Sequence, residues 1–349
     1  MRIAVAMSGG MDSTAAALLL KRKGHEIIGL HMRLHSNSEV TWLAARKAAQ
    51  EIAVPIYVVD LSKEFSEIVV APFVEQYARG YTPSPCPICN RHIKMGLLFE
   101  HARQFGCEKL ATGHYARITE GSGGLSLSKG KDLTKDQSYF LFNLTEEMLG
   151  RTIFPLGEFA KNQIRELLRQ ESISVAESEE SQELCFIPGG NYRAFLVEKN
   201  VPCEPGYIVN RQGKILGSHK GITNFTVGQR RGIGVPASRP LYVIRIDART
   251  NAVVVGFKEE TFRSSVLIRG INLLPLFRPS RGDRFLVKVR STSKAVGCSV
   301  VRDFDTSLEL EFDQPQSGIA AGQAGVLYSG NQLAGGGWIA DSFSYVNVK

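Results

Sequence analysis

The chain has 349 residues, more than one typical hydrophobic core, and its 43% hydrophobic and 22% charged residues indicate a soluble globular protein of two or three domains. No segment is long and apolar enough to cross a bilayer, and no secretory signal or secreted disulfide framework is evident, so we expect a cytoplasmic protein with no membrane partner. The net charge of +8 favours a polyanionic partner such as nucleic acid.

The first 112 residues alternate short apolar runs with helical stretches, which predicts a doubly wound parallel sheet. The predicted strands are residues 2–7, 26–32, 55–60 and 109–112, and the predicted helices are residues 14–24, 42–53, 64–79 and 90–105. Ligands of such sheets bind at the carboxyl ends of the strands. We therefore expect Ser8, Met32 and Gly113 to converge on one ligand site.

The remaining residues change from a mixed to a β-rich pattern. A hairpin around residues 121–124 and a polar loop are followed by predicted helices at 159–170 and 192–199. Beyond Pro205 the pattern is one of short alternating strands with Gly, Asn and Pro turns, including residues 207–217, 241–256, 284–289, 308–312 and 325–328. We predict domains at residues 1–204, 205–260 and 261–349, the last a small barrel or sandwich.

The most informative motif is Ser-Gly-Gly-Met-Asp-Ser at residues 8–13. A strand, a tight glycine turn and a helix N-terminus present backbone N–H groups to an anion. The two glycines keep Cβ atoms away from a phosphate, and the two serines add hydroxyl donors. No Gly-Lys-Ser/Thr follows, so this is not a Walker loop. Asp12 is predicted either to position magnesium or to cap the helix.

Three of the cysteines are candidates for chemistry. Cys86 and Cys89 lie in a proline-rich loop that we expect to end directly before the helix at residue 90, with an arginine and a histidine nearby. This position predicts lowered thiol pKa values. The pair fits a redox dithiol, metal or cluster ligands, or one nucleophile with a helper. From spacing alone Cys185 fits a buried core residue, and Cys107 and Cys298 are predicted to serve packing.

An ordered series of motifs covers nearly the whole chain. It resembles the bacterial tRNA-specific 2-thiouridylase family, whose members are ATP pyrophosphatases with an adenine nucleotide alpha-hydrolase-like domain and a C-terminal β-barrel. The matching segments are residues 8–13, 89–90, 111–117, 135–141, 180–186, 219–221, 226–232, 318–323 and 335–337.

The resemblance implies an ATP site and a tRNA site. ATP, with Mg²⁺, would be bound by Ala6, Met7, Ser8, Gly9, Gly10, Met11, Asp12, Ser13, Met32 and Gly113. The tRNA would be bound by Ser84, Pro85, Cys86, His114, Lys135, Asp136, Gln137, Arg290, Ser291 and Gln323.

It also implies the reaction. The wobble uridine (position 34) of tRNAs with Lys, Glu or Gln anticodons would be flipped into the pocket, and its C2 oxygen would be adenylated, with release of pyrophosphate. Cys185 would carry a persulfide delivered by a cysteine desulfurase or a sulfur-relay protein, and Cys89 would be the partner thiol as sulfur displaces AMP.

One departure leaves the sulfur step open. The best-known members of the family have an aspartate where this chain has Cys86. Cys86, Cys89 and Cys185 are therefore also candidate ligands of a [4Fe–4S] cluster with one open iron. Two further alternatives are an ATP-dependent amide- or lysidine-forming ligase, which has no use for three placed cysteines, and a noncatalytic RNA-binding or sulfur-trafficking protein, which gives no reason for residues 8–13.

Overall fold

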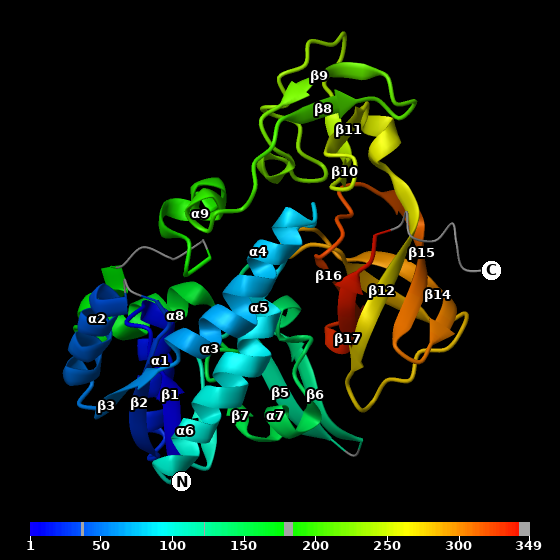
Figure 1. Cartoon of the computed structure of the whole chain (residues 1–349). Coiled ribbons are helices and arrows are strands. Elements are labelled where there is room, and N and C mark those ends of the chain that lie inside the picture. Colours follow the sequence, from blue (N-terminus) through cyan, green and yellow to red (C-terminus); the bar gives the residue numbers. More distant parts are fainter. Residues whose placement is uncertain (36–37, 122, 178–183, 342–349) are drawn as a thin grey trace.

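The computed structural model describes residues 1–35, 38–121, 123–177 and 184–341, and it has three parts (Figure 1). A parallel sheet with its helices forms the first part, a small sheet the second and a barrel the third. The predicted fold class, an α/β first domain followed by a β-rich domain and a β-barrel, is confirmed. Among the described residues, no helix has the length and apolar character needed to span a membrane.

The first part is built on a five-stranded parallel sheet in the order β3-β2-β1-β4-β7. Its strands are β1 (Arg2–Ala6), β2 (Glu26–Arg33), β3 (Ile56–Asp60), β4 (Lys109–Ala111) and β7 (Thr152–Ile153). Side chains of a strand alternate between the two faces. Ile3 and Val5 accordingly join one buried cluster, while Ala4 and Ala6 join another on the opposite face. Both faces of the central strand are therefore buried, as its continuous apolar run predicts.

Helices cover both faces of this sheet, and their bounds largely match the prediction. They are α1 (Met11–Arg22), α2 (Ser38–Glu51), α3 (Ser62–Phe65), α4 (Ala71–Ala78), α5 (Pro85–Ile88), α6 (Phe99–Gln104), α7 (Glu146–Gly150), α8 (Lys161–Gln170) and α9 (Tyr192–Glu198). In Figure 1 the helices α3 to α6 run between the sheet and the barrel. Short 3₁₀ segments occur at η3 (Ser138–Leu141), η4 (Ser174–Glu177) and η5 (Pro188–Gly190).

Two stretches of this helical region are π-helical, and one helix starts earlier than predicted. The π-helices are η1 (Ser66–Val70), between α3 and α4, and η2 (Cys89–Leu98), between α5 and α6. Because Pro85 occupies the first turn of α5, Cys86 and Cys89 lie within the helix. The prediction of a loop up to residue 89 is therefore wrong. Proline fits the first helical turn, where its missing N–H would have no partner in any case.

The second part is a four-stranded sheet in the order β10-β11-β8-β9. It consists of β8 (Gly206–Val209), β9 (Ile215–His219), β10 (Tyr242–Asp247) and β11 (Ala252–Gly256), with 3₁₀ segments η6 (Ile222–Asn224) and η7 (Lys258–Thr261). Both predicted hairpins are present, β8 with β9 and β10 with β11. A buried cluster that includes Ile208, Val243 and Val255 holds the sheet together.

The third part is a closed barrel, since β12 pairs with both β15 and β17. Its strands are β12 (Arg263–Leu273), β13 (Arg284–Lys288), β14 (Val296–Phe304), β15 (Ser307–Gln316), β16 (Ala324–Ser329) and β17 (Gln332–Ile339). Closure brings β17 close to β12: a Cβ atom at Gly335, whose φ is +145°, would lie 2.3 Å from the carbonyl oxygen of Asn272. A glycine is therefore required there.

The barrel and the first part share one sheet and one core. The hairpin of β5 (Ala116–Gly121) and β6 (Gly124–Lys129) extends the barrel sheet, because Ser128 pairs with Gln332 of β17. The buried side chains between them come from both parts and include Met95, Leu127, Tyr139, Phe142, Leu274, Val326, Tyr328 and Leu333. The domain boundaries predicted above, 1–204, 205–260 and 261–349, remain a prediction.

Candidate active site

The glycine-rich segment, residues 8–13, spans the turn between β1 and α1 and the first turn of α1, as predicted, and we call it the phosphate loop. Gly10 is the N-cap of α1, and Gly9 has a φ of +84°, a conformation that side-chain-bearing residues rarely adopt. The amide N–H of Ser8 donates to the Ser13 hydroxyl at 3.2 Å, and that hydroxyl donates to the Gly10 carbonyl at 3.0 Å. The loop thus folds around the first turn of α1, with both serine hydroxyls on the same side, 3.3 Å apart.

Neighbouring strands reach the loop at two points. A Cβ atom on Gly113 would lie 2.8 Å from the main-chain carbon of Asp12 and 2.9 Å from the nitrogen of Ser13, so the segment after β4 packs directly on the start of α1. On β2, His31 Nδ1 donates to the Met7 carbonyl at 3.0 Å. Residues next to the ends of β1, β2 and β4 therefore meet, which supports the predicted convergence of Ser8, Met32 and Gly113.

Asp12 makes contacts that the sequence does not announce. Its carboxylate accepts two hydrogen bonds from Lys161 Nζ, at 2.7 and 2.8 Å, and one from the Tyr115 hydroxyl at 2.9 Å. The helix cap is Gly10, so the capping interpretation of Asp12 is wrong. Because the ammonium group contacts both carboxylate oxygens, Asp12 in this arrangement does not fit a magnesium ligand.

The three candidate thiols influence one another electrostatically. Cys86 and Cys89 lie in the first turns of the α5–η2 helix, with Cys89 only 8% exposed, whereas Cys185 is exposed. Burial is the main cause of the raised pKa values of all three thiols. An ionised Cys185 adds to the pKa values of Cys86 and Cys89, and the ammonium of Lys94 acts on all three in the opposite direction. The three thiols therefore share the influence of one cation, Lys94. The segment 180–183 of the Cys185 motif lies outside the described residues.

The prediction that Cys86 and Cys89 have lowered pKa values is wrong. Burial raises the pKa of Cys86 to about 11 and that of Cys89 to about 12, and desolvation also raises the pKa of Cys185. The helix carries Cys89 into the buried cluster with Ile93 and Leu98, where a thiolate loses its hydration. This loss outweighs the favourable charge of Lys94. Burial of Cys107 and Cys298 agrees with their predicted packing role.

Lys94 carries a charge that acts on the thiols, and no motif in the sequence indicates this role. Five residues along an ordinary α-helix, at about 100° each, place a side chain about 140° away from the starting one. The π-helical turn of η2, whose hydrogen bonds run from residue i to i+5, instead places Lys94 one turn after Cys89. No residue pattern in 89–98 announces that turn. The missing signal is therefore local helix geometry.

His114 lies next to the segment that packs on the phosphate loop. It directly follows Gly113, and its Nδ1 lies 2.7 Å from the Thr112 hydroxyl. Burial and the nearby Lys94 charge lower the pKa of His114 well below its usual range. The ring is therefore neutral at pH 7, which suits hydrogen bonding to a base rather than proton donation.

The other predicted tRNA contacts lie in two places, and several of their polar groups have protein partners. In the loop after β6, the carboxylate of Asp136 accepts from the Gly130 and Ser138 amides, and Gln137 exchanges hydrogen bonds with the Tyr115 main chain. Lys135 belongs to the same loop. The start of the α5–η2 helix is formed by Ser84, Pro85 and Cys86. This helix carries Cys86 and Cys89, and we call it the thiol helix.

The barrel contributes the rest of the predicted contacts. Arg290, followed by Ser291, donates to the carbonyls of Gly318 and Val227 at 2.6 and 2.7 Å. The side-chain amide of Gln323 donates to the Thr82 carbonyl at 3.0 Å. Both side chains therefore bridge different parts of the molecule in this structure.

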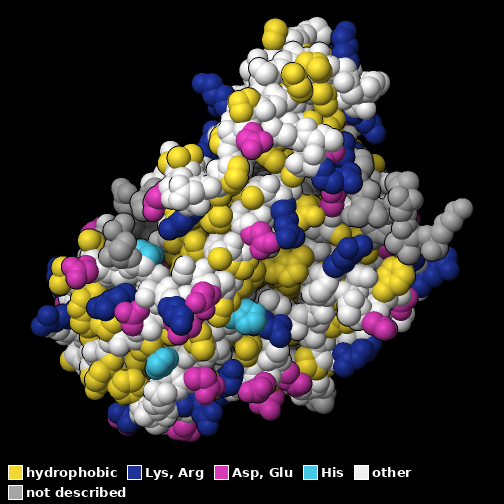
Figure 2. All heavy atoms as spheres, viewed as in Figure 1, with side chains coloured by type: hydrophobic (Ala, Val, Ile, Leu, Met, Phe, Trp, Pro, Cys, Tyr) yellow, Lys and Arg dark blue, Asp and Glu magenta, His cyan; other side chains and the backbone are white. Residues whose placement is uncertain are grey.

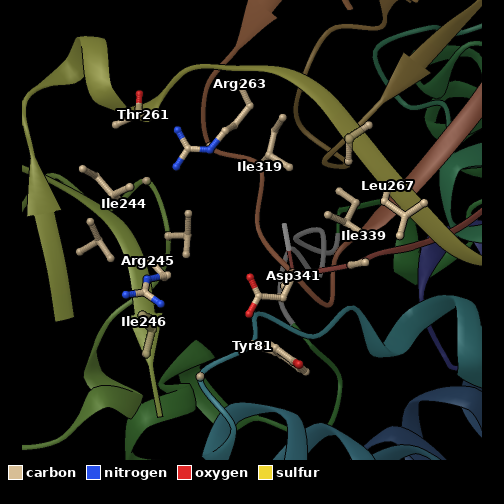
Figure 3. A pocket seen from close by; sticks show the side chains of 18 of the residues that line it. Tyr81, Ile244, Arg245, Ile246, Thr261, Arg263, Leu267, Ile319, Ile339 and Asp341 are labelled. Atoms are coloured by element: carbon tan, nitrogen blue, oxygen red, sulfur yellow. The ribbon is translucent and has the colours of Figure 1, made fainter. Parts of the chain in front are cut away.

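A cavity lies where the three parts of the molecule meet, and no cysteine lines it (Figure 3). Tyr81 follows α4, Ile244 comes from β10, Arg263 from β12, and Ile339 from β17. Its volume of about 60 Å³ is enough for a few water molecules but not for a nucleotide. This cavity is therefore not the ATP site.

Positive charge is not concentrated on the face seen in Figure 2. Lys and Arg side chains are scattered among Asp and Glu there, and hydrophobic side chains gather around the middle of the view. This face thus has no single basic stripe of the kind that marks a nucleic-acid footprint.

Comparison with known proteins identifies the family. Residues 1–189 match the model described as tRNA methyl transferase HUP domain, residues 193–257 the tRNA methyl transferase PRC-barrel domain, and residues 264–339 the aminomethyltransferase beta-barrel domain. The chain is 43% identical to a tRNA-specific 2-thiouridylase MnmA from Syntrophotalea carbinolica, over 97% of this chain and 98% of that one.

A second relative and a solved structure complete the comparison. The tRNA-specific 2-thiouridylase MnmA of Geobacter metallireducens is 41% identical, over 97% of this chain and 96% of that one. The U34-tRNA thiolase NcsA from Methanococcus maripaludis with its [4Fe-4S] cluster is 19% identical, covers 58% of this chain and 68% of its own, and has a TM-score of 0.36, too low to carry an argument. The near-full-length identity to two curated relatives shows that the chain belongs to the tRNA-specific 2-thiouridylase family.

Proposed function

We propose that this protein is a tRNA-uridine 2-sulfurtransferase, which uses ATP to convert the wobble uridine of a tRNA into 2-thiouridine with release of AMP and pyrophosphate. One observation carries the proposal: the charge of one lysine acts both on the candidate thiols and on a histidine that lies beside the phosphate loop. Lys94 influences the thiols and also His114, and Gly113, beside His114, packs on the helix that begins in the phosphate loop.

The first half of the reaction activates the base. The uridine C2 oxygen attacks the α-phosphorus of ATP, the bond to the β-phosphate breaks, and pyrophosphate leaves. The phosphate-loop amides and the hydroxyls of Ser8 and Ser13 would stabilise the negative charge on the departing pyrophosphate. The oxygen at C2 then carries AMP, a far better leaving group than hydroxide.

The second half transfers sulfur. The exposed Cys185 would receive a persulfide from a cysteine desulfurase or relay protein. Attack of the Cys89 thiolate on the inner sulfur forms a Cys89–Cys185 disulfide and releases hydrosulfide. Hydrosulfide adds to C2, AMP leaves, and a dithiol reductant restores both cysteines. The electrostatic coupling of Cys89 with Cys185 supports this assignment.

The cluster alternative has less support. A [4Fe–4S] cluster would need Cys86, Cys89 and Cys185 as a ready set of thiolate ligands. Across residues 1–35, 38–121, 123–177 and 184–341, no group of three His, Cys, Asp or Glu side chains is arranged to hold a metal ion. Burial also favours the protonated thiols of Cys86 and Cys89. The residues as placed do not fit the cluster.

The words "tRNA methyl transferase" in two of the family descriptions do not decide the chemistry. The relatives at about 40% identity carry the name 2-thiouridylase, and a chain with both a phosphate loop and candidate thiols suits ATP-dependent sulfur transfer. We propose as substrates the tRNAs with Lys, Glu or Gln anticodons.

The experiment is a thiolation assay on the purified protein with a wobble-uridine tRNA, ATP and a persulfide-loaded donor. We expect Cys89→Ser and Cys185→Ser to lose 2-thiouridine formation, while Cys86→Ser keeps appreciable activity. Cys203 is exposed, and its thiol donates a hydrogen bond to the Lys220 carbonyl. The control variant Cys203→Ser should therefore retain activity.

Three outcomes would contradict the proposal. Full yield of 2-thiouridine from Cys185→Ser would show that Cys185 does not carry the sulfur. Iron in anaerobically purified protein that is lost in all three variants, Cys86→Ser included, would indicate the cluster route instead. Binding of tRNA without pyrophosphate release by the unmodified protein would indicate a noncatalytic RNA-binding protein.

A further inference from the structure

The barrel contacts the chain segment that leads into the thiol helix. The amide N–H of Thr82 donates to the Ala321 carbonyl at 2.9 Å. In return, the side-chain amide of Gln323 donates to the carbonyls of Thr82 and Pro83, at 3.0 and 3.4 Å. Hydrogen bonds thus join residues 318–323, which we call the barrel loop, to the two residues that precede Ser84, the N-cap of α5.

This contact matters because the helix start has few polar anchors of its own. Ser84 makes no side-chain cap hydrogen bond, and Pro83, Pro85 and Pro87 have no N–H groups. A helix that lacks a local cap takes its position from tertiary contacts. Here the contact with the barrel loop lies within four residues of Cys86, and Cys89 follows one helical turn later.

The barrel loop itself is held firmly. The amide of Gly322 donates to the Ile339 carbonyl, and the amide of Ile339 donates to the Gln323 carbonyl. Gly322 has a φ of +88°, and a Cβ atom there would lie 3.2 Å from the Thr82 carbonyl oxygen. The loop is therefore anchored to β17 and pressed against the segment it binds.

The same loop also meets the second part of the molecule. Arg290 donates to the carbonyls of both Gly318 and Val227. In Figure 3, Ile319 of the loop and Tyr81, just before Thr82, line the water-sized cavity at this junction. The first and second parts of the molecule therefore meet at the barrel loop, and the Gln323 end of that loop binds the segment that precedes the thiol helix.

From these contacts we propose that Gln323 is a positioning residue, which holds the thiol helix in register so that Cys89 lies where sulfur transfer requires it. The inference rests on the proposed function and assigns to the barrel a role in the chemistry besides any contact with tRNA. Loss of the side-chain amide should loosen residues 82–89 without unfolding the barrel.

The test is Gln323→Met, which keeps the length of the side chain but removes its donor. Its matched control is Gln316→Met, because the Gln316 amide donates to Gln314 of its own strand, at 2.7 Å. We expect Gln323→Met to raise the alkylation rate of Cys89, measured without tRNA or ATP, by roughly fivefold or more. In the thiolation assay kcat should fall by roughly tenfold with the KM for tRNA within twofold, since a small misplacement of a reacting group slows chemistry strongly. Gln323→Glu, which places a carboxylate against two carbonyl oxygens, should be worse.

A higher KM for tRNA with unchanged alkylation of Cys89 would overturn the proposal, because it would mean that Gln323 serves only tRNA contact. If Gln323→Met does not fold, Gly322→Ala strains the same contact from the neighbouring residue and must also accelerate alkylation; an unchanged rate there equally overturns it. The alkylation readout needs no tRNA. An absence of thiolation by the unmodified protein would therefore refute the proposed function and leave this comparison intact.

Discussion

At the scale of single residues, the site depends on a balance between burial and charge. Cys89 lies among apolar side chains, which disfavours its thiolate, and Lys94 partly offsets that cost. Buried thiols with raised pKa values are protected from adventitious oxidation, because the thiolate is the reactive form. The site therefore keeps Cys89 unreactive until something brings a sulfur electrophile to it.

Lys94→Gln should make the thiols less reactive. Removal of the cation raises the pKa of Cys89 further, and one pKa unit corresponds to a tenfold change in thiolate fraction. We expect the alkylation rate of Cys89 at pH 8 to fall by roughly three- to tenfold. Lys63→Gln, an exposed lysine on α3, is the control and should leave the rate unchanged. Equal rates in all three proteins would show that Lys94 does not act on the thiol.

The pH dependence follows from the same shift. With a pKa of about 12, the thiolate fraction of Cys89 grows about tenfold for each pH unit between 7 and 9. The alkylation rate of Cys89 should therefore rise with pH over this whole range without levelling off. A plateau reached near pH 8 would mean that the thiol is much more acidic than its burial implies.

At the scale of elements, close packing between the turn after β4 and the start of α1 shapes the ATP site. Gly113→Ala adds a Cβ atom 2.8 Å from the main chain of Asp12 and must push the phosphate loop away. Overpacking of this kind costs about 1–3 kcal/mol, and we expect ATP affinity to fall by roughly ten- to a hundredfold. Isothermal titration calorimetry with a non-hydrolysable ATP analogue measures this affinity.

A matched substitution separates the local clash from a general effect of the added methyl group. Gly121, in the β5–β6 hairpin, has open space around its Cβ direction and no positive φ. Gly121→Ala should bind the analogue as tightly as the unmodified protein. Equal affinity in both variants would contradict the role assigned to Gly113.

Most elements could be predicted from the sequence, and the exceptions have physical causes. The strands of the first sheet follow from their apolar runs, and the phosphate loop follows from residues 8–13. The start of α5 at Pro85 could not be read from a proline-rich segment that equally suits a loop. Lys94 depends on a π-helical turn, and Lys161 reaches Asp12 from 149 residues away, contacts that local patterns do not encode.

At the scale of the whole molecule, the barrel is part of the first domain's structure rather than an appendage. Tyr139 is buried, and its hydroxyl donates to the Ala324 carbonyl of β16 at 2.9 Å. Because Ala324 lies in the barrel, this hydrogen bond joins two parts of the chain that the sequence pattern assigns to different domains. Side chains from both sides of the predicted boundary at residue 261 thus pack into one buried cluster.

Tyr139→Phe tests the strength of that connection. Loss of a buried hydrogen bond typically costs about 0.5–1.5 kcal/mol, with more if the carbonyl stays unpaired. We expect the urea midpoint to fall and the whole chain to unfold in one transition. Tyr207→Phe, at a tyrosine that is 57% exposed, should change stability by less than about 0.5 kcal/mol. Two separate transitions in the unmodified protein would argue against a shared core.

The pairing of β6 with β17 has a consequence for biosynthesis. A chain is made from its N-terminus, and domains that close early can fold while the ribosome is still at work. Here the apolar faces of Met95, Leu127 and Tyr139 gain their last partners, Tyr328 and Leu333, only when nearly all of the polypeptide has emerged. The nascent chain must therefore keep these faces exposed through most of its synthesis, a period in which a holding chaperone has its natural binding target.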